Sequence, residues 1–294
     1  MKLGDAILSE SERGGIAIQF NNSKEYSLSS SPVWIMAGWQ MSFVQLAANT
    51  KLQLNHSKGK NYVKVITGQL TNLNRDAFAQ PKTVRNTIVD ADYVQTGNKV
   101  AIIAIMIKTP KAPKSINSMK QMTVKGPEAE PLSWKRCDEY DWGKEIFKNV
   151  EFYNLRGFQI KNAQGEEVCY VQFWTAGKGV KGTDHNHSKA PSESVPAFCE
   201  IHFGMFNGTG QGGMIDSEVT LPILEGDEHG PFWKINRITG EPVLRDNGAV
   251  YYDIHRWQAG QDKKQSQAFD VWAAFEISPS QAIFNHRGKN DGRS

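Results

Sequence analysis

Short runs of β-branched and aromatic residues recur along the chain and are separated by Gly, Asn and Asp turns. Long amphipathic helical periodicity is hardly visible, whereas the residue types of the apolar runs favour strands. The strongest predicted strands cover residues 42–46, 62–67, 100–107, 167–174 and 269–277. The pattern therefore predicts an all-β chain with few short helices.

Residues 108–133 interrupt this pattern, because they are rich in Pro, Lys and Ser and show no sustained periodicity. Such a composition is typical of a connector between folded units. At 294 residues the chain is long enough for two compact domains. The predicted organisation is an N-terminal extension, a first β unit, a connector and a second β unit, at residues 1–30, 31–110, 111–150 and 151–294.

Two parts of the chain repeat the same short motifs in the same order. Residues 43–46 (FVQL) precede residues 55–58 (NHSK), and residues 170–173 (YVQF) precede residues 186–189 (NHSK). Tandem duplication of one β unit explains this order and its nearly constant spacing. The alternative is that short polar motifs such as NHSK recur by chance in β proteins.

Composition narrows the class of partner. With 39% hydrophobic and 22% charged residues the chain is globular, and its net charge of +3 comes from scattered basic residues. We therefore expect no nucleic-acid partner. No apolar stretch approaches the roughly 18 residues that a membrane span needs, so we expect no membrane partner.

The N-terminus lacks the apolar core of a signal peptide, and the three cysteines form no CxxC pair. The sequence therefore predicts a protein of the reducing cytoplasm without a disulfide framework.

Histidines provide the chemical signal. Four of the seven lie between residues 185 and 229, namely His185, His187, His202 and His229. Side chains two positions apart on an extended strand point to the same face, so the His185-x-His187 pair aims two imidazoles at one point. The same alternation places Glu200 beside His202, and Gly and Pro residues at 226, 230 and 231 hold His229 in a constrained turn.

Three imidazoles and one carboxylate form a ligand set that suits a single divalent transition metal. Zinc is favoured, and iron, manganese, nickel or copper fit the same donors. The alternative is that each histidine is a separate structural or surface residue. We assign this alternative to His56, His255 and His286, although strand alternation lets either His255 or Arg256 face the cavity.

The order of these residues resembles the two motifs of the cupin superfamily. It reads His185-x-His187, Glu200, Gly208 and the GDEHGP segment at 226–231. The resemblance implies a bicupin of two tandem double-stranded, jelly-roll-like β-barrels, with one metal in the second barrel. The first barrel retains only His56 and is expected to be metal-free. The 12 residues between His187 and Glu200 exceed the usual cupin spacing, so Glu200 and His202 both stay open as the next ligand.

In more detail, DHNHS at 184–188 and the segment at 197–213 are similar to the metal-binding cupin portion of fungal aldos-2-ulose dehydratases. This resemblance implies a metal-dependent lyase (dehydratase) or isomerase whose substrate is a small carbonyl-bearing sugar or sugar-derived acid. Glu200 and His202 are the catalytic candidates, because the one that does not hold metal is expected to move the proton. An iron-dependent dioxygenase and a non-catalytic sugar-binding bicupin with a structural metal are the alternatives, and a homodimer stays open.

Overall fold

The computed structural model describes most of the predicted strands. The described residues are 2–3, 6–21, 33–36, 38–54, 61–72, 75–76, 93–109, 123–125, 132–187, 198–206, 210–215, 219–223, 225–226, 228–230, 232, 234, 236, 238, 243–244, 246, 251–260 and 269–278. Regular structure in these residues consists of β-strands, apart from the three-residue 3-10 helix η2 (Cys137–Glu139). The prediction of an all-β chain with few short helices is confirmed. None of the described helical structure could cross a bilayer.

The chain divides into two compact units that interleave along the sequence. Unit 1 comprises residues 1–79, 87–133 and 156–171, and unit 2 comprises residues 80–86, 134–155 and 172–294. Two long strands, β14 (Phe152–Lys161) and β15 (Glu167–Gly177), contribute to both units. The four successive ranges proposed from the sequence stay predictions.

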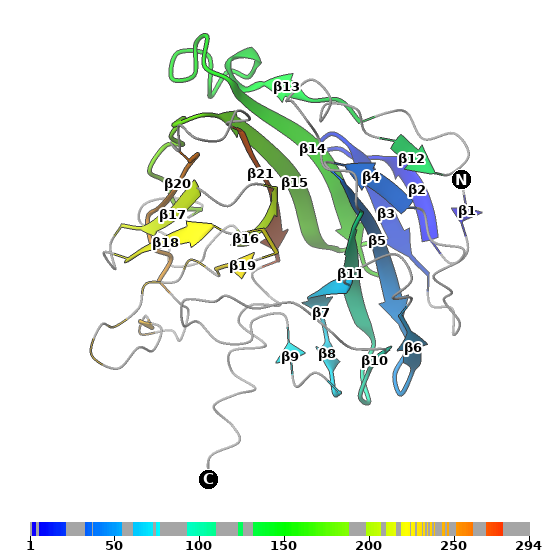
Figure 1. The fold of residues 1–294 in the computed structure, drawn as a ribbon. Helices are drawn as coiled ribbons and strands as arrows, with labels where there is room; N and C mark the ends of the chain where they lie inside the picture. The colour runs from blue at the N-terminus through cyan, green and yellow to red at the C-terminus, as the bar shows by residue number, and fades with distance from the viewer. Residues whose placement is uncertain are drawn as a thin grey trace. The chain divides into compact units, whose positions relative to one another are not determined.

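Unit 1 contains twelve of the labelled strands within its described residues (Figure 1). They are β1 (Lys2–Leu3), β2 (Ala6–Glu10), β3 (Ile16–Phe20), β4 (Val33–Met36), β5 (Trp39–Leu46), β6 (Lys51–Gln53), β7 (Asn61–Thr67), β8 (Gln69–Leu70), β9 (Arg75–Asp76), β10 (Tyr93–Gln95), β11 (Ala101–Lys108) and β12 (Thr123–Lys125). One sheet has the order β12-β4-β5-β11-β7, and another runs from β1 through β2, β3 and β14 to β15. Two-stranded pairs join β6 to β10 and β8 to β9.

The core of unit 1 includes three aromatic rings that join its two larger sheets. Trp34 of β4 and Phe43 of β5 both pack against Phe158 of β14, with ring centroids 4.4 and 5.1 Å from that of Phe158. All three side chains are almost completely buried. Tilted aromatic pairs at these separations stabilise a core beyond the area that they bury.

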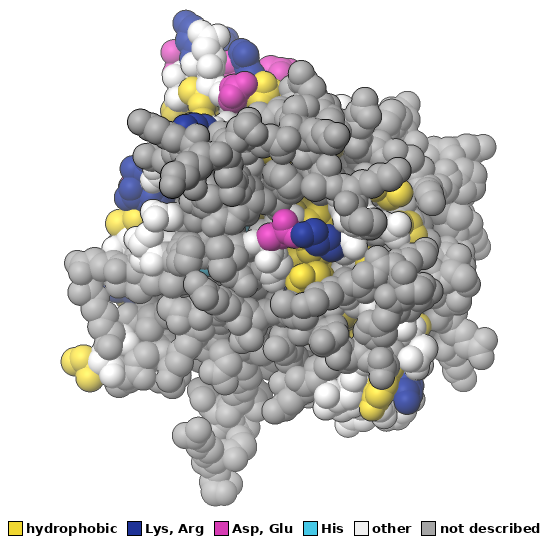
Figure 2. Space-filling view, in the orientation of Figure 1, with side chains coloured by type: hydrophobic (Ala, Val, Ile, Leu, Met, Phe, Trp, Pro, Cys, Tyr) yellow, Lys and Arg dark blue, Asp and Glu magenta, His cyan; other side chains and the backbone are white. Residues whose placement is uncertain are grey.

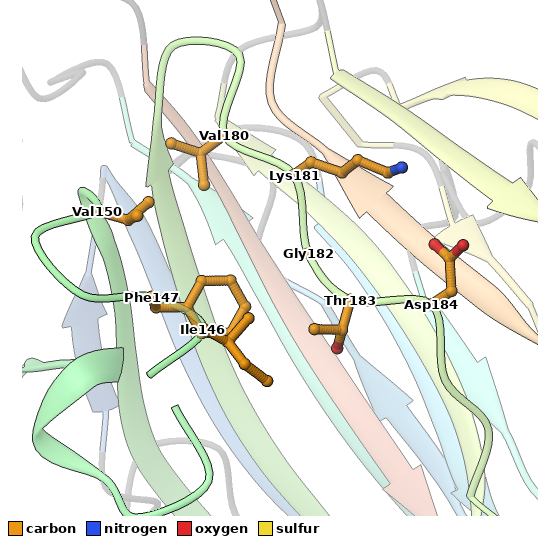
Figure 3. Close-up of a pocket in the computed structure, with 8 residues that line it drawn as sticks. All are labelled: Ile146, Phe147, Val150, Val180, Lys181, Gly182, Thr183 and Asp184. Carbon is orange, nitrogen blue, oxygen red and sulfur yellow. The ribbon is translucent and has the colours of Figure 1, made fainter. Parts of the chain in front are cut away.

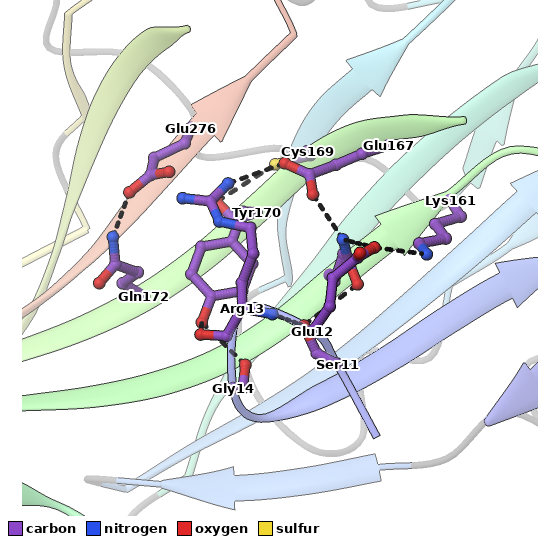
Figure 4. Close-up of polar contacts among 11 residues, drawn as sticks. Ser11, Glu12, Arg13, Gly14, Lys161, Glu167, Cys169, Tyr170, Gln172 and Glu276 are labelled. Carbon is purple, nitrogen blue, oxygen red and sulfur yellow. Dashed lines mark hydrogen bonds and ion pairs between the residues drawn. The ribbon is translucent and has the colours of Figure 1, made fainter. Parts of the chain in front are cut away.

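The β2–β3 hairpin is fixed to β14 and β15 within unit 1 by a polar network (Figure 4). Arg13 forms an ion pair with Glu167 at 2.8 Å and lies 4.0 Å above the ring of Tyr170. The Tyr170 hydroxyl in turn donates to the carbonyl oxygen of Gly14 at 2.9 Å. The buried Ser11 hydroxyl donates to the side-chain oxygen of Gln159. These contacts set the close approach of the hairpin turn to β14.

Unit 2 carries the second set of strands. They are β13 (Lys135–Arg136), the first part of β14, the second part of β15, β16 (Cys199–Phe206), β17 (Gly210–Met214), β18 (Val219–Ile223), β19 (Glu228–His229), β20 (His255–Gln258) and β21 (Phe269–Ile277). The order β15-β21-β16-β19 forms one sheet, and β18-β17-β20 forms another. Trp257 of β20 stacks on Trp272 of β21 at a centroid separation of 3.7 Å. This stack joins the two sheets.

Charges on the face of the molecule in Figure 2 are mixed rather than segregated. Among the described residues in this view, Lys and Arg side chains lie beside Asp and Glu, and no broad basic patch is visible. The expected absence of a nucleic-acid partner stays a prediction.

The hairpin contact predicts a difference between two glycine substitutions. Gly15 has φ +85°, and a Cβ at this position would lie 2.3 Å from the carbonyl oxygen of Gly157. Gly15→Ala should lower the free energy of unfolding by about 2–5 kcal/mol, because left-handed backbone strain of about 1–2 kcal/mol adds to an overpacking cost of about 1–3 kcal/mol. Chemical denaturation measures this loss.

Gly165 is the matched control, since its φ of +81° is similar but its nearest neighbour, the Gln19 side chain, would lie 3.5 Å from the new Cβ. Gly165→Ala should show only the backbone strain of about 1–2 kcal/mol. Equal losses in the two variants would contradict the proposed close packing of the hairpin.

Candidate metal centre

Three histidines and one glutamate converge in unit 2. His185, His187, Glu200 and His255 each offer one ligand atom, and these four atoms lie within 4.8 Å of one another. Glu200 belongs to β16 and His255 to β20, whereas the other two follow β15. Glu200 and His255 are buried, but His185 is exposed. The cluster is therefore open to solvent on the His185 side.

Backbone pairing explains why residues distant in sequence meet here. The N–H of His185 donates to the carbonyl oxygen of His255 at 3.1 Å, and the N–H of His255 donates to that of His185 at 2.9 Å. The neighbouring residues add an ion pair, in which Arg256 Nη2 donates to Oδ2 of Asp184 at 2.9 Å and Arg256 Nε lies 2.9 Å from Oδ1. Such fork-like pairs fix geometry as well as charge. The two imidazoles are therefore held side by side.

Hydrogen bonds also select which ring nitrogens face the cluster. Nδ1 of His185 lies 2.9 Å from the carbonyl oxygen of Thr183, which can only accept. This nitrogen must carry the proton, so Nε2 of His185 has a free lone pair for a metal. Nε2 of His187 and Nε2 of His255 lie 2.5 and 2.9 Å from Oε2 of Glu200. The Glu200 backbone N–H donates to the Tyr252 hydroxyl.

The protonation states suit metal binding. Burial acts to raise the pKa of Glu200, but His187 and His202 outweigh it and hold that pKa well below its usual range. Burial lowers the pKa of His255 to about 4, and desolvation by the surrounding residues lowers the pKa of His185. His187 differs, because the charge and hydrogen bond of Glu200 raise its pKa in spite of burial. At neutral pH the cluster thus supplies an anionic carboxylate and at least two neutral imidazoles.

These donors fit one divalent transition ion. Zinc binds His nitrogen and carboxylate oxygen at about 2.0–2.2 Å, so donors to one ion lie roughly 3–4 Å apart. A separation of up to 4.8 Å requires only a small contraction of the side chains. The cluster indicates a single metal site, with three nitrogen donors and one oxygen donor.

The structure brings together three of the five predicted ligands, His185, His187 and Glu200. His202 is buried next to them, with Nε2 3.1 Å from Oε1 of Glu200, but it is not one of the four clustered residues. His229 lies opposite His202 in the β16–β19 ladder and is 2% exposed, also outside the four. Ligation by His202 or His229 stays a prediction.

His255 is the residue that the sequence analysis missed. It is completely buried, so the solvent-exposed role was wrong, and its place in the cluster makes it a candidate ligand. Strand alternation left open whether His255 or Arg256 faces the cavity, and the structure buries His255 and Trp257 while Arg256 and Gln258 remain partly exposed. Several residues that the sequence-based prediction used lie outside the described residues, namely His56, Gly208, Asp227, His286 and the loop at 189–194.

Three imidazoles and a carboxylate thus converge from different segments of an all-β chain, which is the donor set that the cupin resemblance implied. Residues 7–225 and 217–278 match the family described as the aldos-2-ulose dehydratase/isomerase (AUDH) cupin domain. The chain belongs to this family, and the predicted membership of the cupin superfamily is confirmed.

A curated relative is the aldos-2-ulose dehydratase of Phanerodontia chrysosporium, which is 31% identical over 82% of this chain. The match spans only 30% of the relative's length. Solved structures that match the chain include an IolB-like protein from Salmonella typhimurium, with 8% identity, a TM-score of 0.33 and coverage of 93% of both chains. Another is a cupin 2 conserved barrel domain protein from Leptotrichia buccalis, with 11% identity, a TM-score of 0.27 and coverage of 87% of this chain and 92% of that one.

A separate buried carboxylate lies near the start of β21. Asp270 is 5% exposed, and its Oδ2 accepts from the Gly260 N–H at 2.9 Å, while Oδ1 has no hydrogen-bond partner among the described residues. Burial raises the pKa of Asp270 from 3.8 to about 6 in spite of this hydrogen bond. The folded protein therefore binds the proton of Asp270 more tightly than the unfolded chain does.

The first prediction from this unit concerns pH. A raised folded pKa means that the contribution of Asp270 to stability is fully present below about pH 4 and is lost as the pH rises through about 6. The full loss is about 3 kcal/mol. In Asp270→Asn this loss is absent, so the variant should gain about that much relative to wild type between pH 4 and pH 7.5 in denaturation experiments. A pH-independent difference between the two proteins would contradict the assignment.

The second prediction distinguishes His255 from His229. His255→Ala removes one of the four clustered donors and should weaken zinc binding more than roughly 100-fold, because even residues that only support ligands contribute 10–100-fold. His229→Ala is the matched control and should keep its zinc. Competition with a chelator of known affinity measures both. Loss of zinc in His229→Ala together with full retention in His255→Ala would restore the sequence-based ligand set.

Proposed function

We propose that this chain is a metal-dependent lyase or isomerase that acts on a small carbonyl-bearing sugar or sugar-derived acid. The convergence of His185, His187, Glu200 and His255 carries the proposal, because it provides one ion with four ligands and leaves an exposed side. Membership of the AUDH cupin family supports the sugar substrate. The relative's name describes a dehydratase, and this chemistry is extended here to the chain as part of the proposal.

The ligands proposed for the ion are the four clustered residues, with zinc favoured and iron, manganese or nickel as alternatives. A bound divalent ion would polarise adjacent carbonyl and hydroxyl oxygens of the sugar and make the neighbouring C–H more acidic. The chain must then supply a group that accepts the proton. In this assignment Glu200 is a ligand, which leaves His202 for proton transfer.

His202 has the geometry for this role. Its Nε2 lies 3.1 Å from Oε1 of Glu200, so Nε2 carries the hydrogen and Nδ1 presents a lone pair. Nδ1 is buried and has no hydrogen-bond partner among the described residues. When Nδ1 accepts a proton, the positive charge forms next to the Glu200 carboxylate, which stabilises it.

Aromatic rings limit the access of water to His202 and Glu200. Phe232 stacks on His255 at a centroid separation of 4.3 Å and meets the ring of His202 edge-on at 4.8 Å. Trp272 lies 6.2 Å from His202. Phe232 and Trp272 are 3% exposed each. A proton on His202 is therefore shielded from bulk water on these sides.

Substitution of each residue by glutamine tests the division of roles. Glu200→Gln removes an anionic ligand and leaves the buried imidazoles without their counter-charge, so metal content and stability should fall together. His202→Gln should retain the metal and lower turnover by roughly 10²- to 10⁴-fold, the usual contribution of general acid–base catalysis. Elemental analysis gives the metal content, and a screen of keto-sugars with ultraviolet detection of enones gives the rate.

The same measurements decide between this function and its rivals. Tight sugar binding without turnover would favour a sugar-binding protein, and iron as the native metal together with oxygen consumption would favour a dioxygenase. Full metal content and full activity in both variants on a confirmed substrate would contradict the roles assigned to Glu200 and His202.

A further inference from the structure

A cavity in unit 2 lies outside the metal cluster. Its volume is about 590 Å³, within the range of about 300–1,000 Å³ typical of small-molecule sites. Two segments line it, 146–150 and 180–184, and Figure 3 shows their side chains on either side of the cavity. The lining residues are Ile146, Phe147, Val150, Val180, Lys181, Gly182, Thr183 and Asp184.

One wall of the cavity is apolar and firmly supported. Phe147 belongs to a buried cluster with Phe152, Trp257 and Trp272, and Val150 and Val180 pack against the same cluster. Ile146 lies at the edge and is 59% exposed, although it is a large aliphatic side chain. A ligand that covers Ile146 gains hydrophobic free energy without rearranging the core beneath it.

The charged residues of the cavity leave one unbalanced cation. Asp184 is neutralised by its ion pair with Arg256. Lys181 is exposed and forms no ion pair within the part of the chain that the structure describes. The cavity therefore combines an apolar wall with a net positive edge.

This chemistry differs from that of a sugar site. Among the lining residues, Thr183 offers the single uncharged side-chain hydroxyl, whereas a sugar needs many hydrogen-bond partners. We infer that the cavity is a second binding site, separate from the metal cluster, for a small anionic amphiphile such as an aromatic or branched aliphatic carboxylate. Its apolar body packs against Ile146, Phe147, Val150 and Val180, and its anionic group pairs with Lys181.

The segment that lines this cavity also contacts the metal cluster. Thr183 contributes the carbonyl oxygen that holds Nδ1 of His185, and the Gly182 N–H donates to the carbonyl oxygen of Trp257 at 2.8 Å. A ligand on residues 181–184 therefore touches the segment that orients the exposed histidine. Zinc affinity should change when the cavity is filled.

Titration of the zinc-loaded full-length chain with 8-anilinonaphthalene-1-sulfonate tests the inference, because this probe joins an apolar body to one anionic group and fluoresces in apolar surroundings. We expect saturable binding of one probe per chain. Ile146→Asp should weaken it roughly tenfold or more, since an apolar contact is lost and a like charge is introduced. Lys181→Gln should weaken it up to about fivefold, the value of an exposed ion pair.

Two control variants make the test specific. Lys178→Gln removes a neighbouring exposed lysine that does not line the cavity, and Val100→Asp alters an exposed valine of unit 1. Both should bind the probe like wild type. Unchanged affinity in Ile146→Asp and Lys181→Gln would overturn the inference, as would a dimer that Ile146→Asp dissociates while no probe binds. Neither outcome depends on sugar turnover, so the proposed enzymatic function is tested independently.

Discussion

The candidate metal centre depends on one short antiparallel contact, the pair of backbone hydrogen bonds between His185 and His255. These hydrogen bonds hold together two imidazoles that come from distant parts of the chain. Because of this contact the two rings are neighbours although they are distant in sequence, and their centroids lie 4.5 Å apart. The Asp184–Arg256 ion pair at its side limits rotation about the contact, because both carboxylate oxygens are held.

Glu200 connects this contact to the sheet of unit 2. Its Oε2 approaches His187 and His255, while its Oε1 approaches His202. A single buried carboxylate thus organises imidazoles from three segments. Burying that charge is costly unless it is fully paired, so the surrounding histidines serve stability as well as chemistry. The Tyr252 hydroxyl accepts a hydrogen bond from the backbone N–H of Glu200 and so helps to fix the position of Glu200 in the cluster.

Sequence reasoning found the parts of this site that depend on local geometry. Alternation along an extended segment predicts that His185 and His187 act together and that Glu200 faces the same cavity as His202. His255 could not be assigned in this way, because its position depends on a pairing that brings together residues such as Asp184 and Arg256, 72 positions apart. The turn around His229 resembled part of the cupin motifs. In the structure, His229 pairs with His202 at the edge of the sheet. Local patterns predict which face a residue occupies, whereas long-range register decides which residues meet.

Strand β14 has a further consequence for how the chain can be divided. Within unit 1, its residues Phe158 to Lys161 pair in parallel with Ile16 to Gln19 of β3. Phe158 also completes the aromatic core with Trp34 and Phe43. A fragment that ends at the connector would lack both the parallel partner of β3 and one of the three core rings. Residues on both sides of the connector thus contribute to the core of unit 1, so recombination at that point would divide one core between two fragments.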